Sequence, residues 1–205
     1  MRKRTADHPL TPNVAIVARS YGWKVIPCRD DGSPANGLIP LGLTDRRADE
    51  DEIRRWFDRD PHTNIGLHLG WHSGCVALTL DFRLAGRDGQ TPLRQLHEEF
   101  PSTPTFTIGD GCQALLFLNP GGNCRVGTGG DLDGIRGVTL LGDAETIALP
   151  PSRLRNGARL AWVKDRGPDN IDLAPLPRRF GHCWENLVAR TPTDYDELPQ
   201  SRRPR

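Results

Sequence analysis

The chain lacks long hydrophobic runs, and it also lacks cysteine pairs at the spacing of a metal site. None of its apolar stretches approaches the roughly 18–20 residues that a membrane helix needs, and no hydrophobic segment follows the basic residues 1–4. Its five cysteines are scattered and odd in number, without a C-x-x-C motif. This pattern argues against a disulfide framework and a zinc site. We therefore expect no membrane contact, no secretion and a cytoplasmic location.

The chain also has little excess charge of either sign. It holds 27 Lys and Arg residues against 26 Asp and Glu residues, for a formal net charge of +1. The whole molecule therefore has no strong attraction for nucleic acid, and any affinity for DNA must come from a local basic surface. With 205 residues, of which 36% are hydrophobic, the chain can fold around a substantial core.

The periodicity of apolar residues predicts a mixed α+β fold. It indicates helices over residues 13–21, 44–57 and 91–100, and strands over residues 23–27, 64–70, 74–80, 103–107, 114–118, 137–141, 146–149 and 159–163. Thr44 is expected to cap the second helix, because the acidic residues that follow it suit a helix N-terminus. The strand over residues 74–80 is nearly continuous in apolar residues and is expected to be buried on both faces.

The distribution of apolar and polar residues along the chain predicts one folded domain with less ordered ends. Residues 1–12 are expected to be a flexible N-terminus, and residues 13–163 the domain. Residues 164–205 form a C-terminal extension, with a short helix at about residues 180–189 and a disordered tail rich in Arg and Pro. A glycine-rich stretch over residues 119–134 predicts a long mobile loop.

The strand that ends at Asp81 carries the first chemical pattern. A strand presents residues i and i+2 on the same face, so two carboxylates at its end would form a cradle for a hard divalent cation. Here the two positions are Thr79 and Asp81. One of the two positions therefore carries a carboxylate and the other a neutral hydroxyl.

Two further segments follow in a fixed order. The turn at residues 109–111 holds Gly109 and Gly111, and turns of this kind let backbone N–H groups approach a phosphate. Ala114 follows on the next strand. The last segment contains Thr139 and ends in a Pro-Pro-Ser sequence at Ser152.

In their order and spacing, these segments resemble the motifs of the bifunctional primase/polymerase (Prim-Pol) domain family, a branch of the archaeo-eukaryotic primases. The pattern between Tyr21 and Gly70 also agrees, so the resemblance covers about residues 13–163. It implies mixed sheets flanked by helices, and template-directed nucleotide addition with Mg²⁺ or Mn²⁺. It further implies DNA or nucleotide as ligand and, by analogy, a replication helicase as partner.

The chain departs from this family where the chemistry is done. The resemblance implies an Asp at the position of Thr79, a His at the position of Ala114 and a third Asp at the position of Thr139. Leu141 stands for an Arg and Cys112 for a glycine. These replacements remove metal ligands and a phosphate contact.

The resemblance therefore leaves a short set of candidate site residues. It implies that Asp81 is the one surviving motif carboxylate, both catalytic and a metal ligand, and that Gly109, Gly111 and Ser152 contact the nucleotide. A second register would place Asp133 at the third carboxylate position as a further metal ligand, at the cost of an insertion after it.

Two functions remain open at this point. The first is a degenerate primase/polymerase (a pseudoenzyme) that needs no cofactor and serves as a module binding nucleic acid, nucleotide or protein. The alternative is an active nucleotidyltransferase with a reduced site for Mg²⁺ or Mn²⁺. A third interpretation, an unrelated α+β protein, would gain support from a fold dominated by helix.

Overall fold

The computed structural model describes residues 12–40, 43, 46–84, 94–109, 111–121, 131–132, 135–143, 145–177 and 180. Its helices are α1 (Pro12–Ser20) and α2 (Glu50–Arg59), and residues 94–99 form a further helical segment. Its strands are β1 (Val25–Cys28), β2 (Asn64–His68), β3 (Cys75–Asp81), β4 (Thr105–Thr107), β5 (Cys112–Leu118), β6 (Asp131–Leu132), β7 (Ile135–Arg136), β8 (Val138–Leu141), β9 (Thr146–Ala148), β10 (Ala161–Trp162) and β11 (Ala174–Pro175). The mixed α+β class is confirmed.

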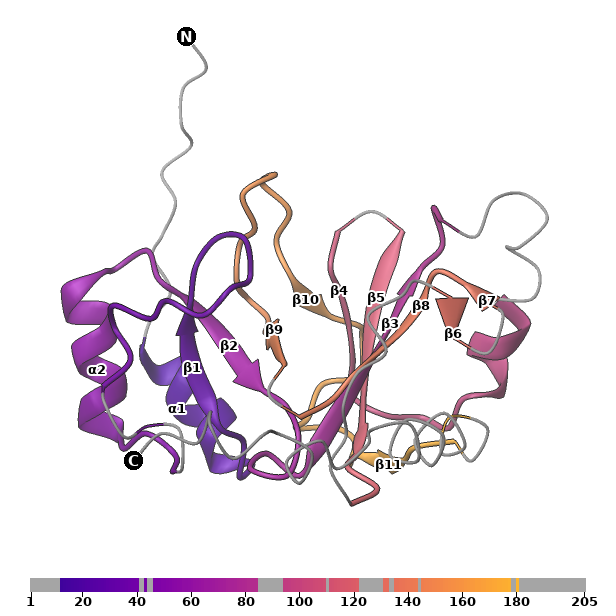
Figure 1. The fold of residues 1–205 in the computed structure, drawn as a ribbon, viewed down its shortest axis with the longest axis horizontal. Helices are drawn as coiled ribbons and strands as arrows, with labels where there is room; N and C mark the ends of the chain where they lie inside the picture. Colours follow the sequence, from indigo (N-terminus) through magenta and orange to yellow (C-terminus); the bar gives the residue numbers. More distant parts are fainter. Residues whose placement is uncertain are drawn as a thin grey trace, which may run out of the picture.

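The strands form two sheets of unequal size (Figure 1). The smaller sheet has the order β1-β2-β9, with antiparallel neighbours, and α1 and α2 lie on its outer side. The larger sheet has the order β10-β4-β5-β3-β8-β6-β7, and β11 lies parallel to β5. Strand β3 is central, because it pairs antiparallel with both β5 and β8.

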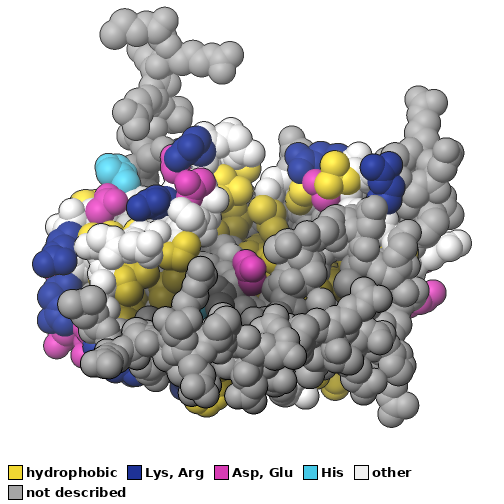
Figure 2. Space-filling model, in the orientation of Figure 1, with side chains coloured by type: hydrophobic (Ala, Val, Ile, Leu, Met, Phe, Trp, Pro, Cys, Tyr) yellow, Lys and Arg dark blue, Asp and Glu magenta, His cyan; other side chains and the backbone are white. Residues whose placement is uncertain are grey.

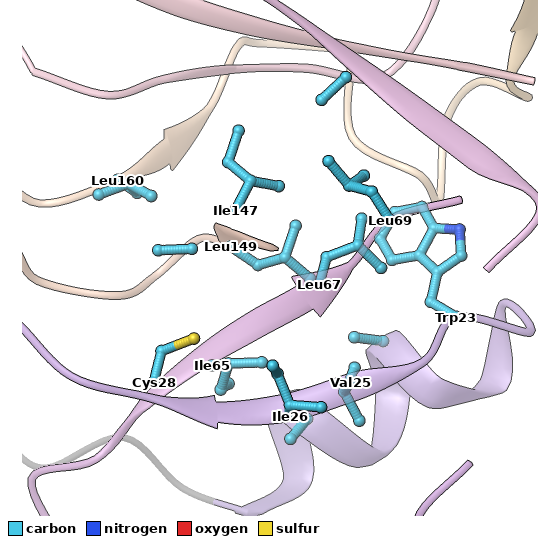
Figure 3. Packing of buried hydrophobic residues seen from close by; sticks show 14 of the residues in the cluster. Trp23, Val25, Ile26, Cys28, Ile65, Leu67, Leu69, Ile147, Leu149 and Leu160 are labelled. Atoms are coloured by element: carbon cyan, nitrogen blue, oxygen red, sulfur yellow. The ribbon is translucent and has the colours of Figure 1, made fainter. Parts of the chain in front are cut away.

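The alternation of side chains along β3 separates two hydrophobic cores. Ala77 belongs to a core shared with the smaller sheet, α1 and α2, and Figure 3 shows Leu67, Ile147 and Leu149 of that core gathered beside β2. Leu78 points to the opposite face, where the core includes Leu96 of the third helical segment. The expectation that this strand is buried on both faces is confirmed.

Helix α2 starts later than the sequence analysis predicted. Its N-cap is Asp49, whose carboxylate accepts a hydrogen bond from the backbone N–H of Glu52 at 2.7 Å. The Glu52 carboxylate accepts one from the N–H of Asp49 at 2.9 Å, so the two residues form a capping box. The predicted cap at Thr44 is therefore wrong, because the reciprocal pair at Asp49 satisfies two backbone donors and a lone Thr satisfies one.

The remaining expectations fall partly outside the described residues. The hairpin of β4 and β5 is confirmed. The loop at residues 122–130, the terminus at residues 1–11 and the chain after residue 180 are not among the described residues. Of the described residues beyond 163, β11 pairs with β5 and the N–H of Thr105 donates to the carbonyl of Arg166 at 2.9 Å. The folded part therefore continues past the boundary expected at residue 163.

Within the described ranges, no helix has the length and hydrophobicity that a bilayer crossing requires.

The capping box of α2 generates a prediction for stability. The Glu52 side chain is buried and accepts hydrogen bonds from Arg46 at 2.5 and 2.6 Å. Replacing Glu52 with Gln should lower the free energy of unfolding at pH 7 by about 1–2 kcal/mol, because Gln keeps the capping bond and loses the charge. Urea unfolding of both proteins measures this difference.

The difference should depend on pH in one direction. The hydrogen bond from Arg46 lowers the pKa of Glu52 from 4.5 to about 2. A lowered carboxyl pKa contributes stability that is complete above the unfolded value and is lost as the pH falls through the folded value. The gap between wild type and Glu52→Gln should therefore narrow between about pH 5 and pH 2. A difference in unfolding free energy that stays constant with pH would contradict the role given to the Glu52 charge. The control variant Glu50→Gln, at a half-exposed ion pair with Arg54, should change stability little.

Candidate active site

The three positions that the sequence analysis singled out as replaced lie side by side. Thr79 of β3 is paired with Ala114 of β5 on one side and with Thr139 of β8 on the other. Residues paired across neighbouring strands point to the same face of a sheet. The row continues through Phe106 of β4 to Trp162 of β10. The sheet therefore places all three replaced side chains on one face, in one row.

This face becomes more accessible toward the end of β3. Ala77 is fully buried, and Thr79 and Asp81, which share its face, are half-buried. Asp81 is paired with Cys112 in the next row, and its N–H donates to the carbonyl of Gly137 at 2.7 Å. We define the candidate active site as Thr79, Asp81, Cys112, Ala114 and Thr139.

Asp81 is held by an arginine two residues further along the chain. Arg83 Nε donates to Asp81 Oδ1 at 2.9 Å, and Arg83 Nη2 donates to Oδ2 at 2.8 Å. The backbone N–H of Arg83 adds a third bond to Oδ1 at 2.9 Å. These bonds, foremost that of the side chain, lower the pKa of Asp81 to about 2. The one motif carboxylate is therefore ionised at neutral pH and already faces a positive charge of the same chain.

Cys112 completes this arrangement. Arg83 Nη2 lies 3.0 Å from Cys112 Sγ, so the guanidinium bridges β3 and β5. Burial and the neighbouring Asp81 raise the pKa of the Cys112 thiol. The thiol is therefore protonated at neutral pH and acts as a small neutral neighbour.

The glycine turn between β4 and β5 lies next to these residues. Gly109 and Gly111 both have positive φ angles, 110° and 75°, which favour glycine. A Cβ atom at Gly111 would lie 3.0 Å from Arg83 Cγ, and one at Gly109 would lie 3.3 Å from the Cβ of Ala158. The turn therefore packs closely on Arg83 and on the segment between β9 and β10. Nucleotide contact by these glycines stays a prediction.

Ser152 has a different environment from the one expected. Its side chain is fully buried. Its hydroxyl accepts a hydrogen bond from the N–H of Ile65 at 3.1 Å and donates to the carbonyl of Ile65 at 3.2 Å. This hydroxyl joins the segment after β9 to β2. The expectation that Ser152 contacts a nucleotide finds no support in this geometry.

Exposed arginines lie on segments that contact the candidate active site or the glycine turn beside it. Exposed arginines lie on the segment after β3, on β7 and on the segment between β9 and β10: Arg83, Arg136, Arg153, Arg155 and Arg159. Figure 2 shows Lys and Arg side chains on both sides of a hollow in which hydrophobic side chains gather. Arg155 is paired with Asp30 at 3.0 Å. The border is therefore rich in arginine, although aspartates balance Arg83 and Arg155.

The residues present do not fit a pair of divalent cations. Among the described residues, no three His, Cys, Asp or Glu side chains come together as a metal site. The central row offers two hydroxyls and a methyl group, and the hydroxyl of Thr79 lies 3.3 Å from the carbonyl of Thr139, to which it donates. Mg²⁺ and Mn²⁺ require several oxygen ligands, with carboxylates among them. Asp133, the ligand of the second register, lies outside the described residues.

The structure also identifies a site residue that the sequence analysis missed. Arg83 was not among the candidates, yet it makes most of the polar contacts of Asp81. Its position two residues after the single acidic residue of a strand end was the available signal. Thr139 is paired with Thr79, and its assignment to the third carboxylate position stays a prediction.

The comparison with protein families gives one match. The family described as bifunctional DNA primase/polymerase, N-terminal (Prim-Pol), matches residues 15–179. No curated protein is similar enough to the chain to count as a match. The family match covers most of the chain and includes the segment beyond residue 163 that packs on β5.

The neutral row predicts that carboxylates placed there would bind a metal. In the triple variant Thr79→Asp, Thr139→Asp and Arg83→Ala, three carboxylates would share one face. We expect this variant to bind Mn²⁺ at least about tenfold more tightly than wild type, because each added carboxylate supplies a charged oxygen ligand. Titration calorimetry with Mn²⁺ measures the affinity.

A stability measurement controls for folding. Adjacent carboxylates repel each other, so the triple variant should have a lower Tm than wild type in EDTA and should regain stability with Mn²⁺. The variant Thr107→Asp and Thr146→Asp, which adds the same two carboxylates on separate sheets, should gain no Mn²⁺ affinity. A folded triple variant without such a gain would show that the row does not form a ligand cradle.

Proposed function

The chain belongs to the bifunctional DNA primase/polymerase family, matched to its N-terminal domain, and from this premise we propose that it binds nucleic acid without transferring nucleotides. The coarser statement, a DNA primase/polymerase-like protein, follows from the family match. The loss of catalysis and the choice of nucleic acid as ligand are the two parts of the proposal.

The row across β5, β3 and β8 carries the first part. Nucleotide transfer by this class of enzyme uses two divalent cations, one near the attacking hydroxyl and one at the triphosphate. Each cation needs charged oxygen ligands in fixed positions. Ala114, Thr79 and Thr139 supply no negative charge. Asp81 supplies one, and Arg83 neutralises it. This arrangement favours a site without nucleotidyltransferase chemistry.

The preserved framework and the arginine-rich border support the second part. Gly109 and Gly111 still form the tight turn beside the site. Lys and Arg side chains lie on both sides of the hollow (Figure 2), and arginine binds phosphate oxygens with paired N–H groups. Because the net charge is only +1, the affinity for DNA should be modest, and it should fall with salt in proportion to the number of phosphates that the arginines contact.

The test combines DNA binding with primer extension. We expect fluorescence anisotropy to detect binding of a labelled single-stranded oligonucleotide at low salt, with the same affinity in EDTA and in Mn²⁺. Primer extension with dNTPs and Mn²⁺ should give no product. Arg159→Glu should weaken binding severalfold, and Arg59→Glu, the same charge change on α2, should have little effect.

Each contrary result has a distinct meaning. Extension that disappears in Asp81→Ala would establish the alternative, an active enzyme with a reduced metal site. Absence of DNA binding by the folded wild type would refute the binding part of the proposal. Equal effects of the two charge reversals would show that the border of the hollow is not the binding surface.

A further inference from the structure

The guanidinium of Arg83 has donors left over after its contacts with Asp81 and Cys112. Within the described residues, its hydrogen bonds use Nε and Nη2. A guanidinium carries five N–H donors, two of them on Nη1. The side chain of Arg83 is 63% exposed, whereas that of Asp81 is 21% exposed. Among the described residues, the guanidinium therefore keeps exposed surface and Nη1 donors beyond its contacts with Asp81 and Cys112.

Arg83 is also held in place from three directions. Asp81 binds its inner edge with two carboxylate oxygens. Cys112 of β5 contacts Nη2 at 3.0 Å. Gly111 leaves room for the aliphatic part, since a Cβ there would lie 3.0 Å from Arg83 Cγ and 3.5 Å from Cδ. A bidentate contact fixes the plane of a guanidinium, so its free donors keep a defined direction.

We propose that Arg83 supplies the positive charge with which this site binds a phosphate group, so that phosphate binding requires no divalent cation. The ligand class is a phosphate of a nucleotide or of the nucleic-acid backbone, bound by the free edge of the guanidinium. This inference deepens the proposed function and relies on it for the biological ligand, but not for the phosphate site itself.

The charges of the surrounding residues support this role. A site with three carboxylates repels a phosphate until metal ions reverse its charge. Here Thr79, Thr139 and Ala114 are neutral, and the pair of Asp81 and Arg83 is neutral as a whole. An incoming phosphate therefore meets N–H donors without the repulsion that a metal would have to cancel.

The experiment measures phosphate binding with and without metal. Titration calorimetry with inorganic tripolyphosphate and with dATP, and anisotropy with single-stranded DNA, should each give the same affinity in excess EDTA and in Mn²⁺. Arg83→Ala should weaken binding of these phosphates about tenfold or more, and Arg83→Lys should restore part of it. Arg59→Ala on α2 is the matched control and should leave binding unchanged.

The variant Asp81→Asn tests whether this carboxylate positions Arg83 or binds a metal ion. If Arg83 binds the phosphate, removing the negative charge of Asp81 should leave the affinity unchanged or raise it, because Asn can still accept a bond from Arg83. If a metal held by Asp81 binds the phosphate, the same change should lower the affinity. Circular dichroism melting of each variant confirms that it is folded.

The outcomes separate this inference from the proposed function. Equal affinities of wild type and Arg83→Ala for DNA would overturn the Arg83 inference alone. Loss of DNA binding by wild type in EDTA would do the same. Tripolyphosphate binding that depends on Arg83, without any DNA binding, would overturn the proposed function and sustain the inference. Binding of none of the three probes by the folded wild type would overturn both.

Discussion

The antiparallel pairing of β3 with both β5 and β8 is the constraint on which the rest of the structure depends. Its register places Thr79 between Ala114 and Thr139 and sends Leu78 to the opposite core. A slip of one residue would bury Asp81 among apolar side chains and expose leucines in its place. Hydrophobic burial therefore keeps the register fixed, whichever side chains occupy the site row. The framework of the sheet therefore does not depend on which polar or small side chains occupy the row.

The replacements in the row are consistent with one another in electrostatic terms. Neighbouring carboxylates destabilise a fold unless cations are bound between them, because each raises the energy of the other's charged form. With Thr79 and Thr139 in the row, this requirement disappears. Among the residues of the candidate active site, Asp81 carries the negative charge. Arg83 balances that charge, with Nη2 2.8 Å from Asp81 Oδ2. The charge of Asp81 is therefore balanced by a residue of the same chain.

Apolar periodicity was enough to predict most strands and helices from the sequence. The predictions failed for polar groups whose hydrogen-bond partner is distant in the chain or whose hydrogen bonds form a reciprocal pair. The apolar run in β3 and the glycine turn after β4 are strong local signals. The cap at Asp49 depends on a reciprocal bond with Glu52, and the acidic run after Thr44 hid it. Ser152 follows two prolines, a context typical of exposed loops, and only the fold brings its hydroxyl to the backbone of Ile65. The pairing of β11 with β5 has no local signal either, since Ala174–Pro175 is too short to show a strand pattern.

The weakness of exposed ion pairs decides how Arg83 acts. A pair with a 63% exposed arginine contributes little to stability in water, so a metal ion could displace the guanidinium at small cost. Arg83 alone would therefore not exclude a metal ion from Asp81. The row adds two hydroxyls and no further carboxylate to Asp81, which is a poor set of ligands for a pair of hard cations. Excluding metal therefore does not account for Arg83. Its exposed guanidinium is better explained by the phosphate-binding role that we propose for it.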